Sequence, residues 1–214
     1  MREAGIRHGR VVDLGCGSGV WAATLMDNGH SVLGVDTSAA MIALARRNAP
    51  GARFVRGSLW SVHLPPCDAI TSIGECLNYA FDGVHGTKEM AALFRSALRA
   101  LRPGGLFVFD VLGPAGDHVP PVRRHFTEGA SWTCLVKVTS TRRMLTRHIT
   151  TFTRHHNAYR RSMETHVQHL HNPDTLLRLL RNTGFAARRF RSYGTMPPRT
   201  GHAVFLARKP RIRQ

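Results

Sequence analysis

The chain has 214 residues, of which 43% are hydrophobic, and this predicts one globular domain with a real core rather than a disordered chain. The sequence contains neither a run of 18 apolar residues nor an N-terminal leader pattern, so we expect a cytoplasmic protein with no membrane partner. The four cysteines (Cys16, Cys67, Cys76 and Cys134) form no CxxC pair, which argues against a zinc ribbon or a disulfide framework.

The charge is distributed unevenly along the chain. Lys and Arg total 30 against 13 Asp and Glu, a net charge of +17. Almost all of this excess lies in residues 121–214, where Glu128, Glu164 and Asp174 are the only acidic residues. Such asymmetry is compatible with an anionic partner, such as nucleic acid or an acidic small substrate. An equally good interpretation is an arginine-biased genome, because only three of the basic residues are lysine.

Strands and helices are predicted to alternate through the first half of the chain. Strands are expected at residues 10–14, 31–35, 53–55, 67–73 and 106–111, and helices at 19–28, 39–47 and 88–101. The third helix has the clearest amphipathic pattern, and the Arg102-Pro103-Gly104-Gly105 stretch is expected to end it. This alternation predicts a Rossmann-like parallel sheet covered by helices on both faces.

The second half changes character. Four consecutive strands are expected at residues 122–128, 131–139, 144–153 and 159–169, with turns but no helices between them. They predict an antiparallel β insertion, spanning about residues 115–172, within a single domain of residues 1–214. A helix at 173–183 and two strands at 185–193 and 202–209 are expected to close the chain.

The most informative stretch follows the first strand. In VVDLGCGSG, Asp13 precedes Gly15, Gly17 and Gly19, and glycines after a strand let the backbone turn tightly and approach a ligand. The second strand ends at Asp36, about 20 residues later, where a carboxylate can accept hydrogen bonds from both hydroxyls of a ribose. The pair predicts a site for a nucleoside-containing cofactor.

The glycine spacing distinguishes between cofactors. A dinucleotide site needs GxGxxG, whereas here the third glycine comes one residue early, and the Asp13 carboxylate would disfavour pyrophosphate but favour an ammonium group. The blocks VVDLGCGSG, VLGVDTSAAMIALAR and LRPGGLFVFDV together resemble the class I S-adenosylmethionine-dependent methyltransferase family. The resemblance covers residues 11–111, and the final helix and strand pair is similar to the closing antiparallel hairpin of that family. It implies a seven-stranded sheet with a C-terminal antiparallel strand.

The resemblance also implies how the cofactor, S-adenosylmethionine, is held. The glycine loop, including Cys16, would pass its methionine end, with Asp13 orienting the loop and the amino group. Asp36 would hold the ribose, and the adenine would lie near Thr37, Met41, Ser58 and Leu59. Ile73 would lie in the loop after the fourth strand, near the transferred methyl group. Many relatives have Asp where this chain has Ser58. Relatives also have some tens of residues before the first strand, so either this protein lacks a covering helix or its start lies upstream.

The loop after the fourth strand bears on the acceptor. The stretch GECLNY resembles small-molecule N- or O-methyltransferases, so Glu75, Asn78 and Tyr79 are the predicted acceptor contacts, with Glu75 also a candidate catalytic residue. The alternative is that Glu75 caps a short helix and Tyr79 belongs to the core. The aromatic motif of nucleobase amine methyltransferases is absent here, and Cys76 lacks the preceding proline of the carbon-5 pyrimidine enzymes.

Seven histidines lie in residues 122–172 of the antiparallel insertion, which is expected to roof the acceptor pocket. His169 and His171 should share one face of a strand while His166 points to the other, so HVQHLH does not predict a metal site. Glu164 and His166 share a face in a Glu-x-His pattern similar to that of small-molecule relatives, and His166 is the second candidate catalytic residue. His155 and His156 are further candidates for a general base.

Three functions are therefore weighed. The first is methyl transfer to a nitrogen or oxygen of a small metabolite, for which an anionic acceptor would suit the charge. The second is an RNA-directed methyltransferase, which the basic half favours but the scarcity of aromatic residues there disfavours. The third is a non-enzymatic relative that only binds the cofactor. The sequence gives no prediction of the oligomeric state.

Overall fold

The computed structural model describes residues 5–83, 86–114, 120–197 and 199–211. Seven strands form the main sheet in the order β10-β11-β5-β4-β1-β2-β3. Their bounds are β1 Arg10–Leu14, β2 Ser31–Asp36, β3 Arg53–Arg56, β4 Cys67–Ser72, β5 Leu101–Leu112, β10 Ala186–Phe190 and β11 His202–Arg208. The first five run parallel, and β11 pairs antiparallel with both β5 and β10. The predicted fold class, a parallel sheet with a C-terminal antiparallel strand, is confirmed.

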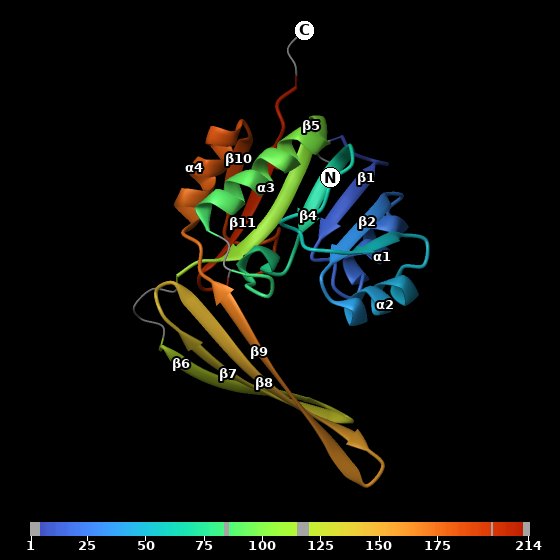
Figure 1. Cartoon of the computed structure of the whole chain (residues 1–214), viewed down its shortest axis with the longest axis vertical. Helices are drawn as coiled ribbons and strands as arrows, with labels where there is room; N and C mark the ends of the chain where they lie inside the picture. The colour runs from blue at the N-terminus through green and yellow to red at the C-terminus, as the bar shows by residue number, and fades with distance from the viewer. Residues whose placement is uncertain (1–4, 84–85, 115–119, 198, 212–214) are drawn as a thin grey trace.

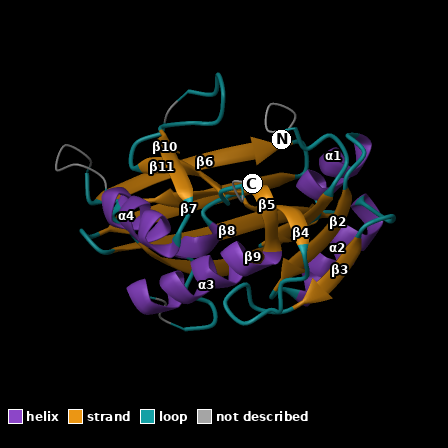
Figure 2. Cartoon of the chain, turned by 90° about the horizontal axis from the view of Figure 1, so that it is seen from above, coloured by secondary structure: helices purple, strands orange, loops and turns teal. Residues whose placement is uncertain are grey.

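Helices cover both faces of this sheet (Figures 1 and 2). On one face, α1 (Val20–Asp27) and α2 (Ala39–Asn48) pack over Val11 and Val32. On the other face, α3 (Thr87–Ala100) and α4 (Pro173–Thr183) pack over a large core that includes Phe94, Phe107, Phe109 and Phe205. Adjacent strand residues point to opposite faces, so the continuous apolar runs of β1 and β5 supply both cores. None of the helices described is long and apolar enough to cross a membrane.

The boundary between α3 and β5 differs from the prediction. The strand was expected to begin after the Arg102–Gly105 stretch, but β5 begins directly at Leu101. Its pairing with β4 jumps from Cys67 opposite Leu101 to Ala69 opposite Leu106, so the intervening residues form an irregular bulge within the strand. Gly104 has φ 82°, a conformation that glycine adopts without strain.

A second sheet of four antiparallel strands lies below the carboxyl ends of the parallel strands (Figure 1). Its strands are β6 Val122–Gly129, β7 Trp132–Ser140, β8 Met144–His155 and β9 Ala158–His169. They follow one another as a meander, and the many Thr and Val residues in them suit a pleated strand. The predicted strands of the insertion are therefore present, while residues 115–119 at its start lie outside the described residues.

Candidate active site

The glycine loop after β1 is fixed to the end of the neighbouring strand. The backbone N–H groups of Gly15 and Cys16 both donate to the carbonyl of Val35, at 2.8 and 3.0 Å. Gly15 has φ 76°, and a Cβ there would overlap the Sγ of Cys76. Gly17 has φ 52°, and a Cβ there would meet nothing within 4 Å. The loop therefore packs tightly at its first glycine and presents open backbone at its second.

Asp13 lies beneath this loop and is only 2% exposed. Its Oδ1 accepts a hydrogen bond of 2.7 Å from the Thr71 hydroxyl, which itself accepts from the Trp21 Nε1 at 3.3 Å. Burial raises the pKa of Asp13 to about 6, partly offset by the Thr71 hydrogen bond. A carboxylate held so deeply can support the loop and favour a nearby ammonium group.

Asp36 ends β2 and faces the cleft from the other side. Its Oδ2 accepts from the Gly17 N–H and its Oδ1 from the Ser38 N–H, both at 2.9 Å. Ser38, not Asp36, caps α2, because its hydroxyl accepts from the Met41 N–H. Each carboxylate oxygen still has lone-pair capacity, so the group is oriented and able to accept from a vicinal diol. This arrangement fits the ribose of a nucleoside.

A cavity opens next to Asp36. Its lining is mostly apolar, with Asp36 and Asp82 as its charged groups: Gly15, Val35, Asp36, Thr37, Gly57, Leu59, Trp60, Cys76, Tyr79, Phe81 and Asp82. Of the residues expected near the adenine, Thr37 and Leu59 line this cavity, whereas Met41 is 37% exposed and is not among the lining residues. The Ser58 hydroxyl hydrogen-bonds to Asp82. A carboxylate from a different segment therefore stands beside Ser58, where many relatives have their own Asp.

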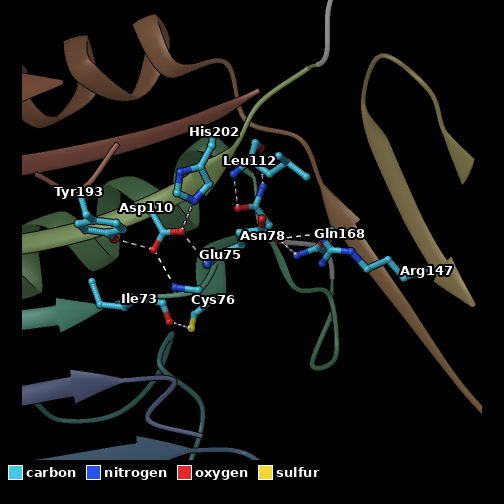
Figure 3. Close-up of polar contacts among 11 residues, drawn as sticks. Ile73, Glu75, Cys76, Asn78, Asp110, Leu112, Arg147, Gln168, Tyr193 and His202 are labelled. Atoms are coloured by element: carbon cyan, nitrogen blue, oxygen red, sulfur yellow. Dashed lines mark hydrogen bonds and ion pairs between the residues drawn. The ribbon is translucent and has the colours of Figure 1, made fainter. Parts of the chain in front are cut away.

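The loop after β4 is held by Asp110, which the sequence analysis gave no role. Asp110 is 1% exposed and accepts four hydrogen bonds (Figure 3). Its donors are the N–H groups of Gly74 and Glu75, at 2.7 and 3.1 Å, the Tyr193 hydroxyl at 2.9 Å, and the His202 Nε2 at 2.6 Å. This network stabilises the left-handed backbone of Gly74 and Glu75, with φ of 97° and 62°.

Tyr193 and His202 join Asp110 at a second, neighbouring cavity. They line it together with Ile73, Gly74 and Glu75. Burial and the adjacent Asp110 carboxylate raise the pKa of Tyr193 well above its usual range, so its hydroxyl stays protonated as a donor. Because an ionised carboxylate only accepts, His202 donates through Nε2, which leaves its Nδ1 as the ring atom that can take a proton.

Glu75 is engaged with the antiparallel sheet. Its Oε2 accepts from the Arg147 Nη2 at 2.9 Å and from the Gln168 Nε2 at 3.1 Å. Glu75 also occupies the N-cap position of a 3-10 helix, η2 (Cys76–Asn78), but its side chain makes no capping hydrogen bond. The carboxylate instead ties the loop to β8 and β9 at the mouth of the site.

Asn78 is buried away from the cleft, whereas Tyr79 and His166 are in contact with each other beside it. Asn78 is 1% exposed, and its amide bonds to backbone groups of Leu112 and His169 among the described residues. Tyr79 lines the cavity beside Asp36 and stacks on Phe81, with ring centroids 4.7 Å apart. The His166 ring meets both of these rings edge-on, and its Nε2 is 3.1 Å from Glu164. Asn78 thus serves as a clamp, while Tyr79 and His166 border the cleft.

Cys76 is unsuited to act as a nucleophile. Burial raises the pKa of its thiol well above the usual range, and its Sγ donates to the Ile73 carbonyl at 3.2 Å. Burial likewise raises the pKa of Cys16 to about 12. Within the described part of the chain, no three His, Cys, Asp or Glu side chains are grouped so that they could hold a metal ion.

Sequence reasoning missed Asp82, Asp110, Tyr193 and His202. A signal for Asp110 was present, since it stands near the end of a parallel strand as Asp13 and Asp36 do. Asp82, Tyr193 and His202 lie in loops or at a strand start whose folding back onto the site depends on tertiary structure. Local pattern alone could not place them.

The sheet order and the glycine loop define the class I S-adenosylmethionine-dependent methyltransferase fold. A family model described as a methyltransferase domain matches residues 1–189, so the chain belongs to this family. S-adenosylmethionine is the cofactor of the family, and Asp13, the glycine loop and Asp36 are the residues whose geometry fits its two ends.

Individual relatives match over part of the chain. A malonyl-[acyl-carrier protein] O-methyltransferase from Enterobacter lignolyticus is 31% identical over 118 residues, 55% of this chain and 44% of that protein. A trans-aconitate 2-methyltransferase from Acidovorax sp. is 27% identical over 124 residues, 57% of this chain and 45% of that protein. The chain thus matches less than half the length of these relatives.

Solved structures are similar over nearly the whole chain. An S-adenosylmethionine-dependent methyltransferase from Mesorhizobium loti has 25% identity and a TM-score of 0.63, covering 95% of this chain and 92% of that one. A sugar N-methyltransferase from Streptoalloteichus sp. has 22% identity and a TM-score of 0.78, covering 98% and 83%. The latter establishes similarity of fold.

Proposed function

We propose that this protein transfers the methyl group of S-adenosylmethionine to a nitrogen or oxygen atom of a small-molecule acceptor. The observation that carries the proposal is the Asp36 carboxylate, oriented by two backbone N–H groups at the edge of a cavity beside the glycine loop. Relatives that are named for trans-aconitate and for an amino pentose support a small acceptor.

In this proposal the protein mainly binds the cofactor and the acceptor and orients them relative to each other. When bound, S-adenosylmethionine supplies an electrophilic methyl group, so the chain need not provide a nucleophile. Asp36 would hold the ribose hydroxyls, while Leu59 and Trp60 would contact the adenine. The acceptor would enter beside Glu75 and Tyr79, under the antiparallel sheet. Fixing the acceptor in line with the methyl group is the principal source of rate enhancement.

An acceptor hydroxyl or ammonium must also lose a proton. His202 suits this role best, since Asp110 orients its ring and the ring lines the cavity next to Gly74 and Glu75. Glu75 is less suited because Arg147 and Gln168 occupy its Oε2. His166 is the remaining candidate, held by Glu164. A carboxylate acceptor would need no base, and Arg147 and His202 would suit its charge.

The test is a methyl-transfer assay with isotopically labelled S-adenosylmethionine and a panel of carboxylates and amino sugars, including trans-aconitate. Mass spectrometry should find a product heavier by one labelled methyl group, and the Asp36→Ala variant should not form it. Bulk RNA belongs in the same panel. Labelling of RNA alone would favour the RNA-directed alternative, and cofactor binding without any product would favour a non-enzymatic role.

A further inference from the structure

The register of the antiparallel sheet assigns its side chains to two faces. Residues paired directly across strands share a face. Arg147 and His166 are such a pair, and both point toward the loop that contains Glu75 and Tyr79. The opposite face carries a row that crosses all four strands, formed by Phe126, Leu135, Thr150 and Met163. We name this second side the outer face.

The outer face exposes large apolar side chains. In its central row, Phe126 is 65% exposed, Leu135 44% and Met163 66%. On the same face, Val122 is 43% and Met144 38% exposed. An antiparallel sheet with one solvated face normally alternates apolar and polar residues, and a contiguous exposed apolar patch marks an interaction site. The high exposure of the row means that no described element packs over it.

We propose that the outer face is the interface of a homodimer, in which the four-stranded sheets of two copies stack face to face. With the two-fold axis parallel to the strands, β6 of one copy lies over β9 of the other. Phe126 then faces Met163 twice, once on each side of the axis. A row that crosses the whole sheet is self-complementary in this way, as an isologous interface requires, and a thioether on an aromatic ring is a favourable contact.

The outer face is large enough to form a stable dimer interface. Four strands of about ten residues, spaced about 4.8 Å apart with a rise of about 3.4 Å, give a face of about 650 Å². Two stacked copies would bury about 1,300 Å² in total, within the range of stable protein interfaces. The basic residues of this face, such as Arg124, Lys137 and Arg161, flank the apolar row. Their aliphatic stems can cover it while their charges reach the rim.

Nucleic acid is the main competing occupant. A face that binds nucleic acid is expected to be more polar and more basic at its centre, with several rings for stacking bases. Here the central row contains one ring, that of Phe126, and no charge, while the other Phe and Tyr rings of this face, Phe152 and Tyr159, lie toward the β8–β9 turn. The observations therefore favour a second copy of the chain.

The test is analytical ultracentrifugation of the full chain at micromolar concentration, after nuclease treatment, in about 0.15 M and about 1 M salt. The expected mass is twice 23.7 kDa at both salt concentrations. The double variant Phe126→Thr, Met163→Thr should weaken dimerisation by about 100-fold or more. Val55→Thr changes an apolar residue that is 42% exposed at the edge of the main sheet, outside the outer face, and should leave the dimer intact.

Two results would overturn the proposal. One is a wild-type monomer under these conditions, and the other is a folded double variant that remains dimeric. An association that disappears with nuclease or high salt would point to nucleic acid instead. Wild-type protein gives a check that does not depend on the variants: peroxide should oxidise Met163 more slowly than Met196, which is 54% exposed. Faster oxidation of Met163 would contradict a covered face.

Discussion

A substitution at Asn78 tests whether this side chain holds two segments of the site together or contacts the acceptor. The sequence suggests an acceptor contact, but in the structure its amide clamps two segments together. It donates to the carbonyls of Leu112 and His169, at 2.7 and 2.5 Å, and accepts from the Leu112 N–H at 2.9 Å. The side chain therefore joins the end of β5 to the end of β9 beneath the cleft.

The Asn78→Ala variant should lose these three bonds in a site that water hardly reaches. A buried polar group left unsatisfied costs about 1–3 kcal/mol, and partial rearrangement should limit the total to about 3 kcal/mol. For a domain of this size, this corresponds to a fall in melting temperature of about 6–12 °C. Differential scanning calorimetry measures the change, and titration with S-adenosylhomocysteine determines whether the cofactor site survives.

The matched control is Asn182→Ala, the same chemical change at an exposed position of α4. It should change stability by less than about 0.5 kcal/mol. If Asn78→Ala melted within about 2 °C of the wild type, the clamp would be refuted. If it then lost transfer to an acceptor, the direct-contact interpretation would be supported.

Three further predictions concern the cofactor loop and its surroundings. Burial raises the pKa of Asp13 from 3.8 to about 6. The protonated side chain therefore contributes fully to the free energy of unfolding below pH 3.8, and this contribution is lost as the pH rises through 6. In urea unfolding, the free energy of unfolding of Asp13→Asn should therefore rise relative to that of the wild type by up to about 3 kcal/mol between pH 4 and 7. A difference between the two proteins that does not change with pH would contradict the raised pKa. Gly15→Ala should weaken S-adenosylhomocysteine binding at least about tenfold by calorimetry, whereas Gly5→Ala, with φ 81° and an unobstructed Cβ, should leave it unchanged. Iodoacetamide should alkylate Cys76 far more slowly than model thiols, because burial raises its pKa, and rapid labelling detected by peptide mass spectrometry would show that the thiol is accessible.

Much of the fold follows from local sequence. The apolar runs, the Asn172 cap and Pro173 at the start of α4, and Gly184 at its end set those elements without long-range information. The Asp13 loop and Asp36 were predictable because each follows a parallel strand, and such strand ends converge at one edge of the sheet. The start of β5 was not predictable, because a bulge against β4 keeps a Pro-Gly-Gly stretch inside the strand.

The acceptor side depends on contacts between distant segments. Glu75 meets Arg147 and Gln168, which lie 72 and 93 residues further along the chain. His202 reaches Asp110 across 92 residues because β11 pairs with β5. Neither partnership leaves a periodic pattern in the sequence, so the roles of these side chains emerge only from the folded sheet.

The most direct test of the cofactor site is calorimetric titration of the 214-residue chain with S-adenosylhomocysteine. The account predicts micromolar binding that Asp36→Ala abolishes and that Asp27→Ala, which removes an exposed carboxylate at the end of α1, preserves. Equal binding by the wild type and Asp36→Ala would contradict the assignment of Asp36 to the ribose, and absence of binding by the wild type would contradict the cofactor site as a whole.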